Sequence, residues 1–183
     1  YAQQITVNQN FVLNIPDALE FDVAAPLLCA GITTYSPLAR WNVQPGQKVA
    51  ILGLGGLGHM GVQIAVAMGA DVTVLSRTLK KADQAAELGA IRTLATSEEG
   101  FFENHRGEFD LILNTISASV DLGSYLSLLK PRGIMSVVGL PPEELSLHMH
   151  SIISGGKVLI GNNIGGIPET QEMLNFCAEH GIG

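Results

Sequence analysis

Three glycines, Gly53, Gly55 and Gly58, carry the clearest chemical signal in the sequence. They stand in "ILGLGGLGHMG", where the pattern G-x-G-x-x-G follows an apolar run and opens a segment with helical apolar spacing. In that context Gly53 makes a tight turn, Gly55 lets a pyrophosphate approach the backbone, and Gly58 lets a helix pack closely on a strand. Free N–H groups at the helix start then favour the anion. The motif, which includes Gly56 and Leu57, predicts a dinucleotide-binding loop, with a glycine-rich turn that holds no ligand as the alternative.

A cluster of cations follows the second predicted strand. Between Ser76 and Lys81 the chain carries three cations and no anion, although its ten cations are outnumbered by seventeen acidic residues. In dinucleotide folds an acid at this point accepts hydrogen bonds from the ribose 2′-hydroxyl, whereas arginine accommodates a 2′-phosphate. Lys80 and Lys81 also fall in the predicted first turn of a helix, where the dipole disfavours positive charge unless a phosphate offsets it. Ser76, Arg77 and Lys81 are therefore predicted to bind the 2′-phosphate of NADP(H), with a solvated helix start as the alternative.

Two further groups of residues have types that can do chemistry. Cys29 and Thr33 are four residues apart in "APLLCAGITTYSPLA", so on a helix they share a face. A lone cysteine on an apolar helix is usually a small buried hydrophobe, and composition alone does not overturn that interpretation. His148 and His150 share one face if their stretch is extended, but they have no evident third partner. Because a zinc site needs about three protein ligands, we do not assign a metal to this pair.

The elements that must position these residues alternate between strand and helix. Near-continuous apolar runs predict buried strands, and longer segments with helical apolar spacing predict helices. Strands are expected at 48–52, 71–75, 91–95, 109–115, 133–139 and 157–162, and helices at 56–68, 79–88, 120–129 and 169–180. Six apolar strands separated by helices predict an α/β fold with a Rossmann-type, doubly wound, parallel six-stranded sheet.

The first residues of the chain do not fit this alternation. "QITV" and "FVLNI" are strand-like pieces that precede the first strand–helix–strand unit and have no partner strands in this sequence. We expect residues 1–21 to be the tail of a catalytic domain with its linker, and residues 22–183 to be the dinucleotide-binding domain. The sequence is thus interpreted as a domain excised from a longer protein.

Composition excludes several classes of protein. A net charge of −7 over 183 residues makes nucleic acid or an acidic bilayer surface a poor partner. No apolar run approaches the ~20 residues that span a membrane, and no signal peptide is visible. The two cysteines, Cys29 and Cys177, lie far apart and form no cysteine-rich framework. A cytoplasmic setting is the simpler prediction.

Four segments together resemble one known family. "PLLCAGITTYSPL", "GLGGLGHMGVQIA", "SRTLKK" and "GIPETQEMLNFCAEHGI" are similar to segments of the zinc-dependent medium-chain alcohol dehydrogenases. Within that family they resemble the branch of cinnamyl alcohol dehydrogenases and NADP-dependent aldehyde reductases. The resemblance covers essentially the whole chain. It implies that Cys29 is a ligand of the catalytic zinc, and that Thr33 lies near the nicotinamide.

The resemblance also implies further cofactor contacts. It supports Ser76, Arg77 and Lys81 as the 2′-phosphate site, and it adds positions that line the cofactor, namely Thr115, Gly139, Asn162 and Ile164. Asn162 stands where relatives often carry serine.

What the family does gives the expected activity. The resemblance implies an NADP(H)-dependent alcohol dehydrogenase or aldehyde reductase, in which zinc polarises the carbonyl of the substrate and nicotinamide transfers hydride. It places the other zinc ligands, a four-cysteine structural zinc and a proton-relay hydroxyl in a preceding catalytic domain. This chain is therefore expected to bind cofactor and to turn nothing over. It also implies a homodimer through the strand at 157–162, because family members join their sheets through this strand.

Three alternatives stay open on the sequence. A zinc-free reductase of the same superfamily would use Cys29 only for packing. A methyltransferase that uses S-adenosylmethionine would usually carry an acid at the end of the second strand, and Ser76-Arg77 argues against it. A non-catalytic nucleotide-sensing domain is not excluded by any feature of the sequence.

Overall fold

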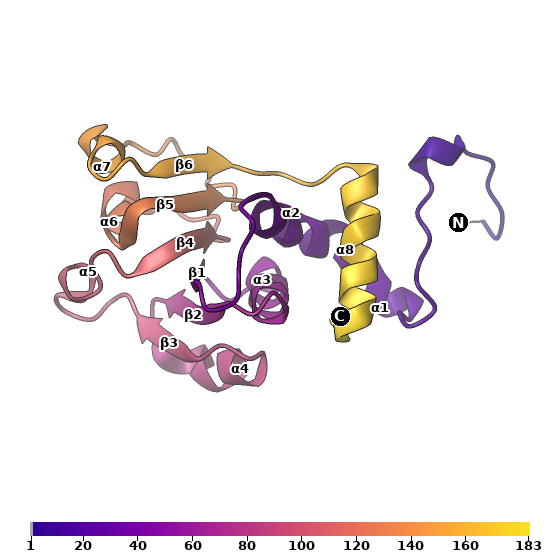
Figure 1. The fold of residues 1–183 in the computed structure, drawn as a ribbon, viewed down its shortest axis with the longest axis horizontal. Helices are drawn as coiled ribbons and strands as arrows, with labels where there is room; N and C mark the ends of the chain where they lie inside the picture. The colour runs from indigo at the N-terminus through magenta and orange to yellow at the C-terminus, as the bar shows by residue number, and fades with distance from the viewer. Residues whose placement is uncertain (1) are drawn as a thin grey trace.

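Six parallel strands form the centre of the structure, a computed structural model that describes residues 2–183 (Figure 1). Their spatial order is β3-β2-β1-β4-β5-β6, and every neighbouring pair is parallel. The order reverses between β1 and β4, so the predicted doubly wound α/β fold is confirmed. The strands are β1 Lys48–Leu52, β2 Asp71–Ser76, β3 Arg92–Ala95, β4 Phe109–Asn114, β5 Leu129–Val137 and β6 Val158–Gly161.

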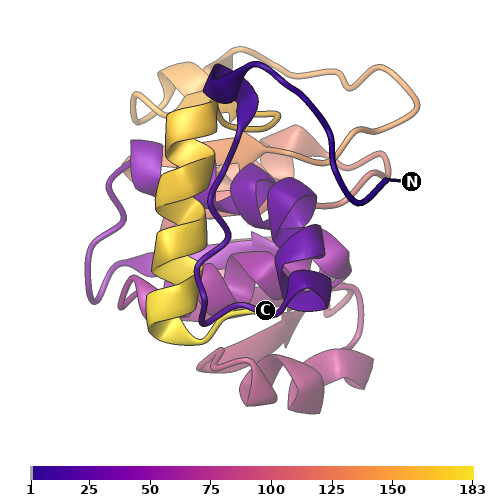
Figure 2. The same cartoon turned by 90° about the vertical axis from the view of Figure 1, so that its right-hand side faces the viewer.

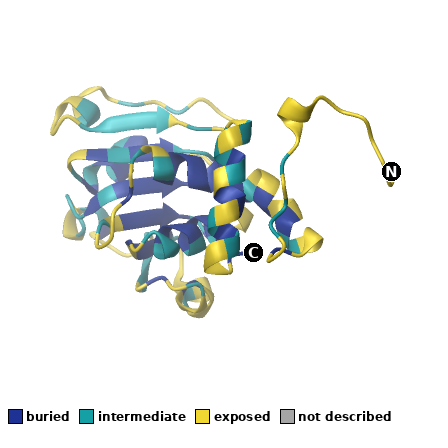
Figure 3. Cartoon of the chain, turned by 45° about the vertical axis from the view of Figure 1, so that its right-hand side comes forward, coloured by how far each residue is buried: buried dark blue, intermediate teal, exposed yellow. Residues whose placement is uncertain are grey.

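Helices cover both faces of the sheet, because the strands are apolar on both sides. Val49 and Ile51 of β1 belong to one core, whereas Ala50 and Leu52 belong to the other. All four side chains are buried, and Figure 3 shows the central strands as the most buried part of the chain. Burial of one large apolar side chain contributes about 1.5–3 kcal/mol, so the two cores fix the sheet in place.

The first core is covered by α1 Phe21–Pro26, η2 Leu27–Gly31, α2 Ile32–Arg40, α3 Gly56–Ala67, α4 Ala82–Glu87 and α8 Ile167–His180. The second is covered by α5 Phe101–Asn104, α6 Leu122–Ser127 and α7 His150–Ile153. Among the helices of residues 2–183, none has both the length and the apolar character needed to cross a membrane.

The structure corrects the predicted boundary before β5. The sequence predicts a helix to residue 129 and a strand from 133, but β5 begins at Leu129, which pairs with Phe109. The pairing then shifts register, so that Leu111 lies opposite Ile134. Arg132, at φ 64°, accommodates this irregularity within "KPRG". Pro and Gly in that stretch predict a turn, but the strand continues through it with a bulge.

The predicted helix at 79–88 is also wrong in its first turn. Leu79–Lys81 form a 3-10 turn, η3, and α4 begins only at Ala82. Lys81 is the residue that precedes α4 and not part of its first turn. The dipole of α4 therefore does not disfavour Lys80 and Lys81 as the sequence predicted, and only the geometry of the site can support an anion there.

The N-terminal segment contains no strand between residues 2 and 15, so "QITV" and "FVLNI" have no partner strands in the described chain, as expected from the sequence. It holds one 3-10 turn, η1 Gln9–Phe11, after which the chain runs alongside α8 (Figure 2). The Asn14 N–H donates to Gln171 Oε1 at 2.8 Å, and Gln171 Nε2 donates to the Asn14 carbonyl at 2.9 Å. Most of the segment is exposed (Figure 3). The boundary at residue 21 remains a prediction.

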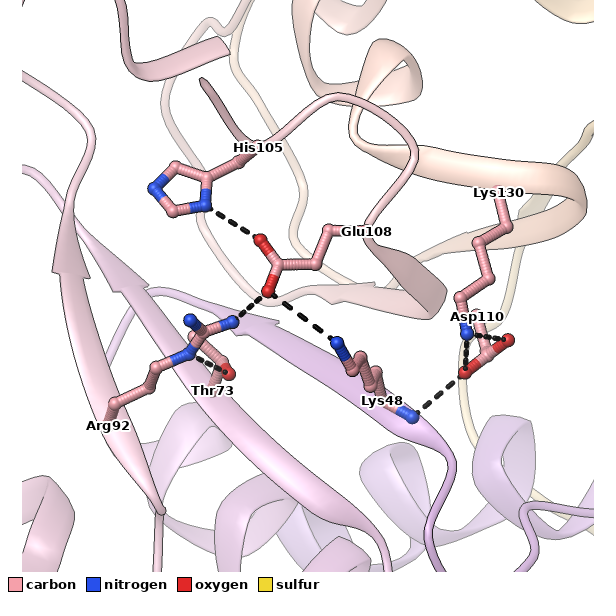
Figure 4. A network of polar contacts seen from close by, with 7 residues as sticks. All are labelled: Lys48, Thr73, Arg92, His105, Glu108, Asp110 and Lys130. Carbon is pink, nitrogen blue, oxygen red and sulfur yellow. Dashed lines mark hydrogen bonds and ion pairs between the residues drawn. The ribbon is translucent and has the colours of Figure 1, made fainter. Parts of the chain in front are cut away.

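A polar network ties together the amino-terminal ends of the strands (Figure 4). Glu108, which precedes β4, pairs with Arg92 of β3, and its Oε2 lies 2.7 Å from His105 Nδ1. Asp110 of β4 accepts from the Lys48 N–H at 2.9 Å and from Lys130 Nζ at 2.8 Å. Burial raises the pKa of Glu108, but hydrogen bonds from Arg92 and His105 outweigh it and hold the pKa below its ordinary value.

We predict that Glu108→Gln destabilises the fold at pH 7 by about 1–2 kcal/mol, because it removes a charge from these hydrogen bonds. The pKa of the Glu108 carboxyl is lower in the folded state than its ordinary value of 4.5. The ionised carboxylate therefore stabilises the fold above pH 4.5, and this stabilisation is lost as the pH falls through the folded-state pKa. Urea unfolding at several pH values should show the gap between variant and wild type closing in acid. An equal gap at pH 7 and pH 3 would contradict the prediction, and exposed Glu99→Gln is the control.

Candidate nucleotide-binding site

A cavity of about 570 Å³ lies at the carboxyl ends of the strands. Its walls come from the glycine loop after β1, the end of β2, the residue after β3 and the loop between β4 and α6. This is the crevice beside the point where the strand order reverses, which is where open α/β sheets bind ligands. The cavity brings together six residues predicted from the sequence, namely Gly53, Gly55, Ser76, Arg77, Lys81 and Thr115.

The glycines of the loop serve two different physical needs. Gly53 has φ 92°, and its N–H donates to the Leu75 carbonyl at 2.9 Å, so it makes the turn at the end of β1. A Cβ on Gly58 would overlap the Gly53 carbonyl, which makes the close approach of α3 possible only for glycine. A Cβ on Gly55 or Gly56 would meet no atom within 4 Å. Of these two residues, Gly55 lines the cavity.

The first turn of α3 faces this loop. Gly55 precedes the helix and has no side chain to cap it, so the first N–H groups of α3 are available to an anion. His59 Nδ1 lies 2.8 Å from the Gly55 carbonyl, so its ring is engaged with the loop backbone. The loop therefore offers main-chain donors to a ligand.

Cations without acidic partners line the other end of the cavity. Ser76 ends β2, and the exposed Arg77 follows it. Lys81 Nζ donates to the Leu54 carbonyl at 2.6 Å, which holds the ammonium against the glycine loop. The Ser97 hydroxyl donates to the Arg77 carbonyl at 2.7 Å and fixes that turn. Within residues 2–183, no ion pair involves Arg77 or Lys81, and no carboxylate lines the cavity.

The remaining predicted residues lie outside the lining of this cavity. Gly139 packs on the backbone of Ile116, where a Cβ would overlap the Ile116 carbonyl. Asn162 follows β6, and its Nδ2 is buried without a hydrogen-bond partner among the described residues. Others not in the lining are Thr33, Gly56, Leu57, Gly58 and Ile164.

Cys29 lies in an unusual stretch of helix. Leu27–Gly31 form a π-helical turn between α1 and α2, and such turns are frequent at functional sites. Cys29 is exposed, so its interpretation as a buried hydrophobe is wrong, whereas Thr33 is buried in α2. Cys177 of α8 is the buried cysteine, and burial raises the pKa of its thiol to about 11. An exposed thiol is chemically suited to hold a metal, whereas Cys177 is not.

The residues around Cys29 do not complete a metal site. No group of three or more His, Cys, Asp or Glu residues within 2–183 is placed to hold a metal ion. Cys29 could supply one of the about three protein ligands that a catalytic zinc needs. His148 and His150 are not on an extended strand, because His150 begins α7, and their ring centroids are 6.4 Å apart.

Several residues that line the cavity were not predicted from the sequence. Thr96 directly follows β3, and the position of that strand beside β2 was a signal that could have identified it. Tyr125 comes from α6, and nothing in the sequence pointed to it. The others are Leu52, Leu54, Leu75, Ile116, Ser117, Ala118, Ser119 and Val120.

A second cavity, of about 580 Å³, lies between α5, α6 and α7. Its charges are balanced, because Arg106 and Lys157 are accompanied by Glu103 and Asp121. The Asp121 carboxylate is already engaged as the cap of α6, where it accepts from the Gly123 N–H at 3.0 Å. This cavity therefore defines no particular ligand chemistry.

The sheet topology, the glycine loop and the cavity at the switch point define a Rossmann-type dinucleotide-binding domain. Residues 56–179 match the family described as zinc-binding dehydrogenase. The chain belongs to that family, as the resemblance implied.

Individual relatives agree with this assignment. The chain is 56% identical over 182 residues to NADP-dependent alcohol dehydrogenase C 1 of Mycolicibacterium smegmatis, and it covers 52% of that protein. A cinnamyl alcohol dehydrogenase from Sorghum bicolor superposes with a TM-score of 0.91 at 44% identity, over 96% of this chain and 50% of that one. CAD from Helicobacter pylori, solved in complex with NADP(H), gives 0.87 at 41% identity, over 96% and 50%. The chain thus spans about half the length of the relatives it matches.

The two kinds of glycine give a matched pair of variants. We predict that Gly55→Ala changes stability by no more than about 0.5 kcal/mol, because its methyl group enters open space. The same methyl group would obstruct a pyrophosphate and weaken NADPH binding by at least about tenfold. Gly58→Ala should instead destabilise the fold by about 1–3 kcal/mol, because its Cβ overlaps the Gly53 carbonyl. Thermal unfolding and NADPH titration measure both effects, and a Gly55→Ala variant that binds NADPH like the wild type would contradict the prediction.

Proposed function

We propose that this chain is the cofactor-binding part of an NADP(H)-dependent zinc alcohol dehydrogenase or aldehyde reductase. The observation that carries the proposal is the end of β2, where Ser76, Arg77 and Lys81 line a cavity that contains no carboxylate among the described residues. A carboxylate there would repel a 2′-phosphate, whereas a guanidinium can bind it through two parallel hydrogen bonds. The names of the relatives support the same cofactor, since one is NADP-dependent and another was solved with NADP(H).

The chain's own residues account for how the cofactor would be held. Main-chain N–H groups at the start of α3 bind the pyrophosphate, and Gly55 leaves room for it. Arg77 and Lys81 bind the 2′-phosphate, and Ser97 holds the Arg77 backbone in position. The Asn162 amide has a buried N–H donor without a partner within the described chain, and we assign it to the nicotinamide end of the cofactor.

Hydride comes from the nicotinamide, and zinc supplies Lewis-acid polarisation of the substrate carbonyl when it is bound. The part of this chain is to present the exposed Cys29 thiolate to the metal from the cofactor side. Because one thiolate is too few to hold zinc, we propose that the 183-residue chain binds cofactor but catalyses no turnover. Alcohols and aldehydes are the proposed substrates, and the cytoplasm is the proposed setting.

Arg77→Asp tests the cofactor assignment. We predict that the wild-type chain binds NADPH more tightly than NADH, and that the variant weakens NADPH binding by about a hundredfold. The estimate corresponds to two lost hydrogen bonds to a charged group, each about 1.5 kcal/mol. NADH affinity should be retained, because the new carboxylate can accept from a free 2′-hydroxyl. Equal wild-type affinity for the two cofactors would overturn the assignment, as would equal loss of both in the variant, and Lys80→Asp is a neighbouring control.

We also propose a homodimer formed through β6. This strand is the edge of the sheet, and only one of its sides is paired. The Asn162 N–H donates to the Val137 carbonyl of β5, so the alternating backbone directs the N–H groups of Leu159 and Gly161 toward the free edge. An unprotected edge of this kind is suited to pairing with a second copy.

We predict that Leu159→Pro produces monomers, because it removes one outward donor without touching the bonds to β5. Sedimentation velocity of wild type and variant over a range of concentrations measures the change. NADPH binding by the variant serves as the control for folding. A wild-type chain that stays monomeric at high concentration would refute the proposed dimer.

A further inference from the structure

Two residues with hydroxyl groups, Thr96 and Tyr125, line the nucleotide cavity together with Ser76. Ser76 pairs with Ala95 across β2 and β3, and the next residue, Thr96, donates its N–H to the Ser76 carbonyl at 2.8 Å. Thr96 is thus fixed beside the end of β2. Tyr125 of α6 lines the same cavity.

The Tyr125 side chain is held rigidly. Only 8% of the residue is exposed, and its ring packs edge-to-face on Phe102 with 5.2 Å between centroids. Burial raises the pKa of its hydroxyl, and a hydrogen bond with Thr96 acts in the opposite direction. Tyr125 and Thr96 both line the cavity. A buried aromatic with a polar tip at a cavity wall is a common means of fixing a ligand's orientation.

The rest of the site determines which part of a dinucleotide meets this pair. The pyrophosphate lies at the glycine loop, and the 2′-phosphate of the adenosine ribose lies at Ser76 and Arg77. The purine carried by that ribose must then lie along the remaining wall of the cavity, which includes Thr96 and Tyr125 besides the loop at 115–120. The purine edge opposite the glycosidic bond carries N1, an acceptor, beside the N6 amino group, a donor. Two hydroxyls that line one cavity can complement that edge, because each can donate or accept.

We propose that the hydroxyls of Tyr125 and Thr96 hydrogen-bond to the N1 and N6 edge of the adenine and act as specificity residues for the base. The inference rests on the proposed function and extends it from the phosphate to the base. Tyr125→Phe removes the hydroxyl and keeps the ring on Phe102, and Thr96→Val does the same for the second group.

The experiment compares NADP⁺ with 1,N6-etheno-NADP⁺, in which a fused ring blocks both N1 and N6. Tyr125→Phe should lower NADP⁺ affinity by about fivefold to tenfold, the effect of one lost hydrogen bond, and leave the affinity for the etheno analogue unchanged. Any steric cost of the extra ring is the same in the wild type and the variant. The change in the ratio of NADP⁺ affinity to etheno-NADP⁺ affinity therefore reports the contribution of the hydroxyl alone. Thr96→Val should change the ratio in the same direction.

The control is Tyr35→Phe, because the Tyr35 hydroxyl donates to Glu172 Oε1 at 2.8 Å and does not line the cavity. The ratio of NADP⁺ affinity to etheno-NADP⁺ affinity should be the same in Tyr35→Phe as in the wild type. If Tyr125→Phe weakens both ligands equally, or neither, the proposal is overturned. The preference for NADP⁺ over NAD⁺ is a separate readout, because both carry adenine. If the wild-type chain shows no preference for NADP⁺ over NAD⁺, the phosphate site is refuted, and the test of the base is unaffected.

Discussion

The close approach of Gly58 to the Gly53 carbonyl holds the first turn of α3 against the end of β1. A side chain at Gly58 would overlap that carbonyl, so the packing distance is set by the absence of a Cβ. The approach holds the start of α3 against the glycine loop, whose Leu54 carbonyl accepts a hydrogen bond from Lys81 Nζ at 2.6 Å. The anion-binding geometry therefore depends on one backbone contact, which two buried cores keep in place from either face of the sheet.

The two ends of the sheet differ in how their charges are balanced. At the amino ends, Glu108 and Asp110 neutralise the surrounding cations and join strands that are far apart in the sequence (Figure 4). At the carboxyl ends, Arg77 and Lys81 have no acidic partner within residues 2–183. Charge that is balanced at one end contributes to stability, whereas charge left unbalanced at the other end is available to a ligand.

Sequence patterns predicted the sheet because its strands are apolar on both faces. The glycine motif located the loop because the backbone requires glycine at Gly53 and Gly58. The start of β5 at Leu129 was missed, since "KPRG" reads as a turn while the strand continues through a bulge. The conformation of Lys81 was also missed, because a 3-10 turn and an α-helical turn have similar sequences. Tyr125 reaches the cavity only through the packing of α6 on the sheet, and no local pattern encodes such a tertiary contact.

The central claim is that the cations at the end of β2 bind a 2′-phosphate. Phosphorus NMR of NADP⁺ bound to the chain tests it directly, because the 2′-phosphate resonance reports its own ionisation as the pH is varied. Neighbouring cations favour the doubly charged form, so the account predicts a pKa of the bound 2′-phosphate that is clearly lower than in free NADP⁺. A bound 2′-phosphate that titrates as it does in free solution would contradict the account, since it would place that group in water and away from Arg77 and Lys81.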